Sequence, residues 1–131
     1  MAIFCFDTSI FLIASFFTKI IVSSDTCDIY NAKVLRGSQG ALFYAEIIKG
    51  DIVEEINKLK GYRIIGTSLE GNILGNQEIN GKIALVLGNE SRGMKSEILA
   101  ICDDRFLIDI NTVDSLNVAI AGSIIMYQFK I

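Results

Sequence analysis

A short loop with two glycines and two charged side chains is the stretch of this sequence best suited to chemistry. An apolar run, residues 83–87, leads into Gly88, and Glu90 and Arg92 follow before Gly93. The run is typical of a strand that is buried on both faces in a parallel sheet. Ligands of open parallel sheets bind beyond the carboxyl ends of the strands, and glycine lets the backbone approach a ligand closely. We therefore expect a ligand site at this loop.

Several other chemistries are disfavoured or excluded by the residue types. The loop has four residues between its glycines, as a phosphate-binding P-loop does, but Met94 stands where that motif has lysine, and Glu90 would repel phosphate. No Gly-x-Gly-x-x-Gly motif supports a nicotinamide cofactor. The chain of 131 residues has no histidine, which excludes Ser-His-Asp and Cys-His catalysis and the common zinc sites. No metal site is predicted.

Polar residues also open the last apolar stretch, where Ser115, Leu116 and Asn117 follow one another. Helix capping by Asp114 or Ser115 would explain them. Val118 stands where a capping box has glutamate or glutamine, which leaves Asn117 as a polar side chain at the start of a buried helix. Such a group needs a hydrogen-bond partner, which a bound ligand could supply. Both interpretations stay open from the residues alone.

Basic side chains are the candidates for contact with nucleic acid. The net charge of −3 is unlike that of a general nucleic-acid binder, so any RNA contact must come from local basic groups. Residues 37–40, Gly-Ser-Gln-Gly, are similar to the Gly-x-x-Gly loop of KH modules, although a turn between two short helices explains them more simply. Four side chains in or beside the motif loops are expected to contact phosphates, namely Lys33, Arg36, Arg92 and Lys95.

The order of the elements predicts the fold class. Asp51 is expected to cap an amphipathic helix over residues 52–60, which Gly61 ends, between two strands. This alternation predicts a single α/β domain over residues 1–131 with a mostly parallel sheet flanked by helices. We expect an initial strand or helix, strands at 19–22, near 47, at 62–67, 83–87 and 106–110, helical segments at 31–44, 96–101 and from about 115, and a loop at 68–80.

In a parallel sheet the connections that follow three of these strands open on one edge. The loops that begin at Thr67, Gly88 and Asn111 would then line one pocket. The helix after them is apolar almost all round and carries small Ala119, Gly122 and Ser123 on neighbouring turns. It is therefore predicted to be buried against another helix or a second subunit, as in a homodimer.

The chain is expected to be cytoplasmic. Its three cysteines have no metal-like spacing, which indicates reduced thiols. No basic residue precedes Lys19, whereas a signal peptide begins with one, and Asp7 and Ser15 interrupt the apolar start. A membrane span needs about 20 predominantly apolar residues, so none is predicted.

Three stretches of the chain resemble the SpoU/TrmH family of RNA ribose methyltransferases, within the SPOUT superfamily. They are residues 33–43 (KVLRGSQGALF), 85–93 (LVLGNESRG) and 114–119 (DSLNVA), and the likeness extends from about residue 19 to the end. The resemblance implies an α/β fold with a C-terminal trefoil knot, a dimer packed through helices, and S-adenosylmethionine as cofactor. The implied activity is 2'-O-methylation of ribose in tRNA or rRNA.

The same resemblance assigns site residues. Glu90, Ser115 and Asn117 fall on positions of the family's active site, where they would orient the ribose hydroxyl and the methyl donor. The cofactor would be held largely by backbone contacts. The cofactor-binding positions implied are Thr67, Ser68, Leu87, Gly88, Asn89, Glu90, Gly93, Ile108, Ile110, Leu116 and Asn117.

One part of the sequence departs from the family pattern. The activating group of the family is usually an arginine in an upstream Asn-x-Gly-x-x-x-Arg motif, which would fall at about residues 4–10. This chain has Phe4, Phe6 and Ile10 there, and its first arginine is Arg36. The segment is thus divergent or truncated relative to the family. Two alternatives stay open: a non-catalytic protein that binds S-adenosylmethionine or RNA, and, more distantly, a flavodoxin-like signalling or nucleotide-binding domain.

Overall fold

The computed structural model describes residues 2–4, 19–24, 28–38, 40–75, 77–89, 93–110 and 116–129. Within them, six strands form one sheet in the order β3-β2-β1-β5-β4-β6, and every pairing between neighbours is parallel. The predicted α/β class and parallel sheet are confirmed. The strands are β1 (Ala2–Phe4), β2 (Lys19–Ser23), β3 (Glu46–Gly50), β4 (Tyr62–Ile73), β5 (Lys82–Leu87) and β6 (Asp104–Leu107).

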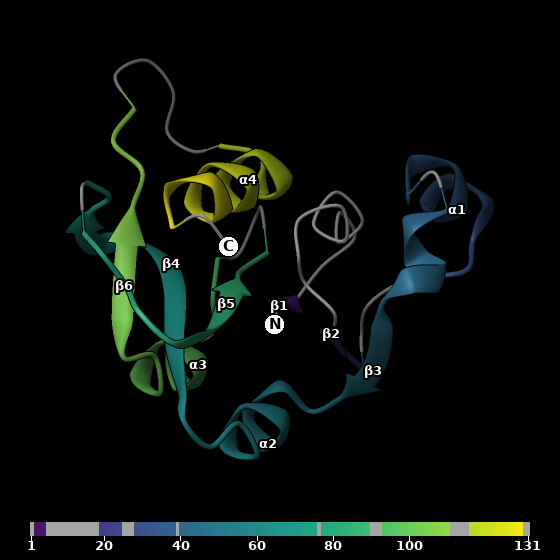
Figure 1. Cartoon of the computed structure of the whole chain (residues 1–131), viewed down its shortest axis with the longest axis horizontal. Coiled ribbons are helices and arrows are strands. Elements are labelled where there is room, and N and C mark those ends of the chain that lie inside the picture. Colours follow the sequence, from purple (N-terminus) through teal and green to yellow (C-terminus); the bar gives the residue numbers. More distant parts are fainter. Residues whose placement is uncertain are drawn as a thin grey trace.

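Helices lie on both faces of this sheet (Figure 1). Helix α2 (Ile52–Asn57) and helix α3 (Ser96–Ala100) pack on one face, and helix α4 (Val118–Gln128) packs on the other. Helix α1 (Ala32–Ser38) and the 3-10 helix η1 (Ala41–Tyr44) share a small core with β3, at the sheet edge far from β6. The Gly-x-x-Gly stretch overlaps the end of α1 and reaches Gly40, the residue before η1, which agrees with a connection between two short helices.

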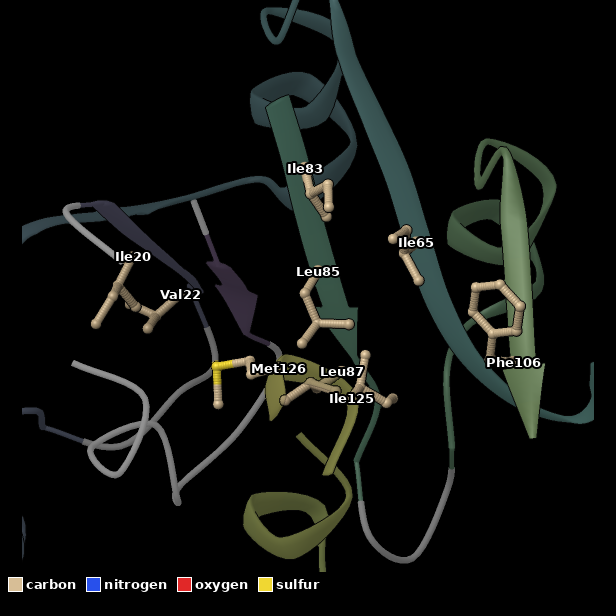
Figure 2. Packing of buried hydrophobic residues seen from close by; sticks show 9 residues of the cluster. All are labelled: Ile20, Val22, Ile65, Ile83, Leu85, Leu87, Phe106, Ile125 and Met126. Carbon is tan, nitrogen blue, oxygen red and sulfur yellow. The ribbon is translucent and has the colours of Figure 1, made fainter. Parts of the chain in front are cut away.

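Strand β5 is the centre of the fold, as its apolar sequence predicts. Its side chains alternate between the two cores: Leu85 and Leu87 contribute to the α4 side, while Ala84 and Val86 contribute to the α2 and α3 side. All four are at most 1% exposed. Figure 2 shows β5 and the residues of the α4-side core, in which Ile125 of α4 lies close to Leu87.

Helix α2 forms for the reasons read from its sequence. The Asp51 carboxylate accepts a hydrogen bond from the Glu54 backbone N–H at 3.0 Å, which caps the helix. Ile52 and Ile56, one turn apart, are buried against the sheet. The helix ends at Asn57, earlier than expected, and Gly61 takes a φ of 78° before β4 begins.

The predicted loop at 68–80 is wrong for its first part, because β4 continues to Ile73. Thr67 and Asn72 both pair with Phe106 of β6, and the register shifts between them. Figure 2 shows β4 passing the tip of β6. A Cβ atom on Gly71 would lie 2.7 Å from the Arg105 carbonyl, so only glycine fits this close passage. The stretch is rich in glycine and asparagine, and pairing with a distant strand outweighs that local preference.

Helix α4 packs on the sheet with one side only. Ala119, Gly122, Ile125 and Met126 are buried against it. The opposite side exposes three large apolar side chains, Ile120, Ile124 and Tyr127. One face of α4 is thus buried on the sheet, and the contact of this helix with another helix or a second subunit stays a prediction.

No helix among the described residues is long and apolar enough to cross a membrane.

Candidate functional site

The register of the sheet brings the predicted loops to one edge. Gly66 of β4 is paired with Val86, and Thr67 with Phe106, so β5 and β6 end at the level of Thr67, within β4. On the other side of β5, Phe4 at the end of β1 is paired with Leu87. The segments that follow β1, β5 and β6 therefore start from the same edge, beside Thr67 of β4.

The loop after β5 is closed by its own backbone. Asn89 and Gly93 exchange two hydrogen bonds, from Asn89 N–H to the Gly93 carbonyl at 3.0 Å and from Gly93 N–H to the Asn89 carbonyl at 2.8 Å. Gly93 has a φ of 66°, in the left-handed region that favours glycine. A Cβ atom on Gly88 would lie 2.7 Å from the Gly93 carbonyl carbon and the Met94 nitrogen. Both glycines are thus required by the path of the chain itself.

Polar side chains of β4 reach the same edge. Thr67 and Ser68 are half-buried, and the Ser68 hydroxyl accepts a hydrogen bond from the Glu70 N–H at 3.2 Å. They do not begin a loop, as the sequence suggested, because β4 continues through them. Their position at the level where β5 ends is nevertheless the predicted one.

The segments after β6 and before α4 supply apolar side chains. Ile108 and Ile110 follow β6, Leu116 precedes α4, and all three are half-buried. Half-exposed aliphatic side chains next to backbone amides and carbonyls suit a ligand with both an apolar ring and charged groups. The residues present therefore fit a nucleoside-containing amino acid.

Asn117 caps α4, so of the two interpretations left open by the sequence, capping by Asp114 or Ser115 is wrong. Its side-chain oxygen accepts hydrogen bonds from the N–H groups of Ala119 at 2.9 Å and Ile120 at 3.4 Å. The helix accordingly starts at Val118. A ligand is not needed to satisfy this oxygen, although the side chain as a whole is exposed.

Three predicted site residues, Glu90, Arg92 and Ser115, lie outside the described residues, as do Asn111 and the upstream segment at 5–10. The other predicted RNA contacts are found on two separate parts of the surface. Lys33 and Arg36 are exposed on α1, at the β3 edge. Lys95 is exposed just before α3, on the face of the sheet that α2 and α3 cover, and its Nζ lies 4.0 Å from a Glu97 carboxylate oxygen.

One supporting contact behind the site, between Gly66 and Cys102, was missed from the sequence. A Cβ atom on Gly66 would lie 2.8 Å from the Cys102 sulfur, so glycine lets β4 pack closely on the end of α3. Burial raises the pKa of the Cys102 thiol to about 11, with a smaller opposing effect of Arg105. This cysteine is protonated at neutral pH and has a structural role. In the sequence, Gly66 before Thr67 was the residue that could have indicated this close packing.

No group of three histidine, cysteine, aspartate or glutamate side chains that could hold a metal ion is found in the described parts of the chain.

A parallel α/β sheet with a glycine-closed loop at its carboxyl edge defines a class of proteins that bind a nucleotide-like ligand there. The chain matches the SpoU rRNA Methylase family over residues 12–127. It therefore belongs to the SpoU family, in agreement with the resemblance of its motifs. The distant flavodoxin-like alternative is excluded by this membership.

Curated relatives carry RNA methyltransferase names. The chain is 30% identical over 116 residues to the 23S rRNA (guanosine(2553)-2'-O)-methyltransferase RlmP of Bacillus subtilis. This aligned region covers 85% of this chain and 46% of that protein. It is 34% identical over 82 residues to the tRNA (guanosine(18)-2'-O)-methyltransferase of Escherichia coli K12. This aligned region covers 60% of this chain and 35% of that protein. The chain thus spans less than half the length of either relative.

Solved structures share the fold. The AdoMet-bound rRNA methyltransferase of Sinorhizobium meliloti superposes with a TM-score of 0.85 at 22% identity, over 98% of this chain and 54% of that one. AviRb of Streptomyces viridochromogenes, a SpoU methyltransferase in complex with AdoMet, gives a TM-score of 0.81 at 22% identity, over 98% of this chain and 56% of that one. These likenesses show that the α/β fold of this chain is similar to that of solved SpoU methyltransferase structures over 98% of its length.

Proposed function

We propose that this chain is the catalytic domain of an RNA 2'-O-ribose methyltransferase that uses S-adenosylmethionine. The observation that carries the proposal is the Gly88–Gly93 loop, closed by two backbone hydrogen bonds at the sheet edge where β5 and β6 end beside Thr67 of β4. Family membership supports it. So do the names of two relatives that methylate a guanosine ribose in rRNA and in tRNA.

The cofactor would lie across this edge. Bound S-adenosylmethionine supplies an electrophilic methyl group on its sulfonium. The backbone of the loop after β5 would hold its polar groups, and the half-buried aliphatic side chains would contact its adenine. The proposed contact residues are Thr67, Ser68, Leu87, Gly88, Asn89, Glu90, Gly93, Ile108, Ile110, Leu116 and Asn117.

The protein's part in the reaction is to orient the ribose hydroxyl and to take its proton. A ribose hydroxyl is a poor nucleophile until its proton is removed or polarised. We assign the orientation to Glu90, Ser115 and Asn117, by the resemblance of their motifs to the family. Holding donor and acceptor in line accounts for much of the acceleration in such transfers.

The group that removes the proton is the part of the mechanism in which this sequence departs from the family pattern. β1 ends at Phe4, which is paired with Leu87, so the segment that carries the family's arginine starts at the proposed cofactor edge. No arginine occurs in this chain before Arg36. This specific observation favours a second candidate function, a protein that binds S-adenosylmethionine or RNA and transfers methyl groups slowly or not at all.

Further features belong to the same proposal. The exposed apolar side chains of α4, Ile120, Ile124 and Tyr127, support a homodimer, since a monomer would leave them in water. The passage of β4 beside β6 and the return of α4 to that region support a C-terminal trefoil knot. We propose a single domain over residues 1–131 in a cytoplasmic protein that acts on tRNA or rRNA.

Calorimetry with S-adenosylmethionine and with its demethylated product tests the cofactor site. Saturable binding of both ligands with a stoichiometry of one per chain is the expected result. Well-folded protein that binds neither ligand would overturn the proposal. Transfer of a radiolabelled methyl group to bulk RNA then separates the catalytic function from the binding-only alternative.

A further inference from the structure

Aromatic side chains are displayed on the small unit formed by α1 and η1. Phe43 and Tyr44 of η1 are 76% and 86% exposed, and Tyr30, which precedes α1, is 59% exposed. The only pair of stacked or tilted rings among the described residues is Phe106 with Phe129, so these three rings have no aromatic neighbour there. Large exposed rings are costly in water and commonly mark a binding surface.

The rings are held by an ordered turn. Leu42 is buried against Val34 of α1 in a core of its own. Gly40 takes a φ of 83° and its carbonyl accepts a hydrogen bond from the Phe43 N–H at 3.1 Å. Successive side chains of a 3-10 helix point about 120° apart, so fixing Leu42 inward turns Phe43 and Tyr44 outward.

Two cations accompany these rings. Lys33 and Arg36 are exposed and three residues apart on α1, hence on one face of that helix. Neither belongs to an ion pair among the described residues. The Asp28 carboxylate accepts the Tyr30 N–H at 2.9 Å, which leaves its charge in place, and Glu46 is paired with Lys19 at 3.1 Å. Within residues 28–38 the two cations outnumber the one carboxylate, so this segment has a net positive charge in an acidic chain.

This combination differs from the other exposed apolar surface. The exposed side of α4 carries Ile120, Ile124 and Tyr127, and α4 has no charged residue in its first or last turn, which suits packing against a second apolar helix. Rings together with unpaired cations suit a ligand that has flat bases and phosphates. Single-stranded RNA has both, and its bases are free to stack.

We propose that Tyr30, Phe43 and Tyr44, together with Lys33 and Arg36, form a surface for single-stranded RNA at the β3 edge of the sheet. The rings stack on unpaired bases, and the two cations contact phosphates. The inference rests on the proposed RNA substrate and adds where the strand that flanks the modified nucleotide is held. Helix α1 follows the carboxyl end of β2, so this surface belongs to the same sheet as the proposed cofactor site. In the strand order, β2 and β1 lie between β3, beside this surface, and β5, beside the cofactor site.

Tryptophan fluorescence tests this surface, because the chain has no tryptophan. The full chain carrying Tyr44→Trp is titrated with a short oligouridylate, with an abasic ribose-phosphate oligomer of equal length, and with an RNA duplex. We expect saturable quenching by the oligouridylate and none by the other two. Phe43→Trp serves as a second reporter if Tyr44→Trp does not fold.

Further variants separate the two kinds of contact. In the reporter chain, Phe43→Ala should weaken oligouridylate binding about 5- to 100-fold, as for the loss of one stacked base, while Phe43→Tyr keeps the affinity. Lys33→Ala with Arg36→Ala should flatten the slope of log K against log salt by about 1.4, as for two single-strand phosphate contacts.

Three results would overturn the inference: no quenching while filter binding detects bound RNA, equal quenching by the abasic oligomer, or a change of emission with protein concentration alone, which would assign the surface to a second copy. Cofactor calorimetry on the same preparations distinguishes the failures. A chain that binds S-adenosylmethionine but shows no quenching loses only this surface, whereas a chain that binds no cofactor loses the proposed function.

Discussion

The side-chain amide of Gln128, at the end of α4, donates a hydrogen bond to the Gly75 carbonyl at 2.6 Å, across 53 positions of sequence. The next residue, Phe129, places its ring 5.5 Å from that of Phe106 in β6. The carboxyl end of α4 therefore contacts both the segment after β4 and strand β6. This connection positions α4, whose first residues reach the proposed cofactor edge.

Removing the Gln128 amide should loosen that connection. Gln128→Ala is expected to lower the free energy of unfolding by about 1 kcal/mol, as for the loss of one partly buried hydrogen bond. Gln77→Ala is the matched control, because Gln77 is exposed and bonds only to nearby Gly75 and Ile73. Its effect should stay within about 0.5 kcal/mol in urea denaturation. Equal losses in the two variants would contradict a special role for the long-range bond.

A side chain at Gly88 should damage the loop after β5. In Gly88→Ala the new Cβ atom would lie 2.7 Å from backbone atoms of Gly93 and Met94, so the loop must move. We expect a loss of about 1–3 kcal/mol in stability and of about 10²-fold in methyl transfer, typical of displaced positioning groups. Gly50→Ala is the control, since its Cβ would make ordinary contacts with Glu55 at 3.7 Å. Unchanged cofactor affinity in Gly88→Ala would remove the loop from the site.

Much of this fold was predictable from local sequence. The apolar run of β5 indicates a strand with both faces covered, and Asp51 marks the start of α2, although the helix ends at Asn57, before Gly61. The convergence of the loops also follows from parallel pairing. What local pattern could not supply is the continuation of β4, since it depends on pairing with β6, which lies more than thirty residues further along the chain.

The start of α4 shows the same limit at the candidate site. Leu116 and Val118 are both apolar, so periodicity does not decide between a helix that starts at Ser115 and one that starts after Asn117. The choice is made by Asn117, whose side chain satisfies two backbone N–H groups. Sequence reasoning identified Asn117 as a polar group in need of a partner, and the structure supplies one within the helix itself.

Variants of Asn117 test whether this residue only caps α4 or also belongs to the cofactor site. Serine caps helices about as well as asparagine, whereas alanine loses about 1 kcal/mol. Asn117→Ser should therefore keep the stability that Asn117→Ala loses, as measured by thermal unfolding. If Asn117 also orients the reacting groups, both variants should lose methyl transfer or cofactor affinity. Full function in Asn117→Ser would show that capping is its whole contribution.

The exposed side of α4 predicts the oligomeric state. Ile124→Asp places a charge in the apolar stripe with Ile120 and Tyr127, and should convert a dimer into a monomer in sedimentation experiments. Ile73→Asp is the control, because Ile73 is 58% exposed on β4 and does not belong to the apolar stripe of α4. The original chain should remain dimeric at about tens of micromolar. A monomer under those conditions would contradict the homodimer.

The upstream segment decides whether this chain is an active enzyme. Phe4 is paired with Leu87, which brings the start of that segment to the proposed cofactor edge, yet residues 5–10 contain no arginine. General acid–base help is typically worth about 10²–10⁴-fold in rate, so its loss can hide activity while cofactor binding persists. A version in which residues 1–17 are replaced by a segment with the Asn-x-Gly-x-x-x-Arg motif should therefore transfer radiolabelled methyl groups to bulk RNA faster than the original chain.

The control carries the same replacement with alanine at the arginine position, and both should bind S-adenosylmethionine equally. Equal, robust transfer by all three proteins would mean that the arginine is dispensable and that another group, such as Arg36 or Arg92, activates the ribose hydroxyl.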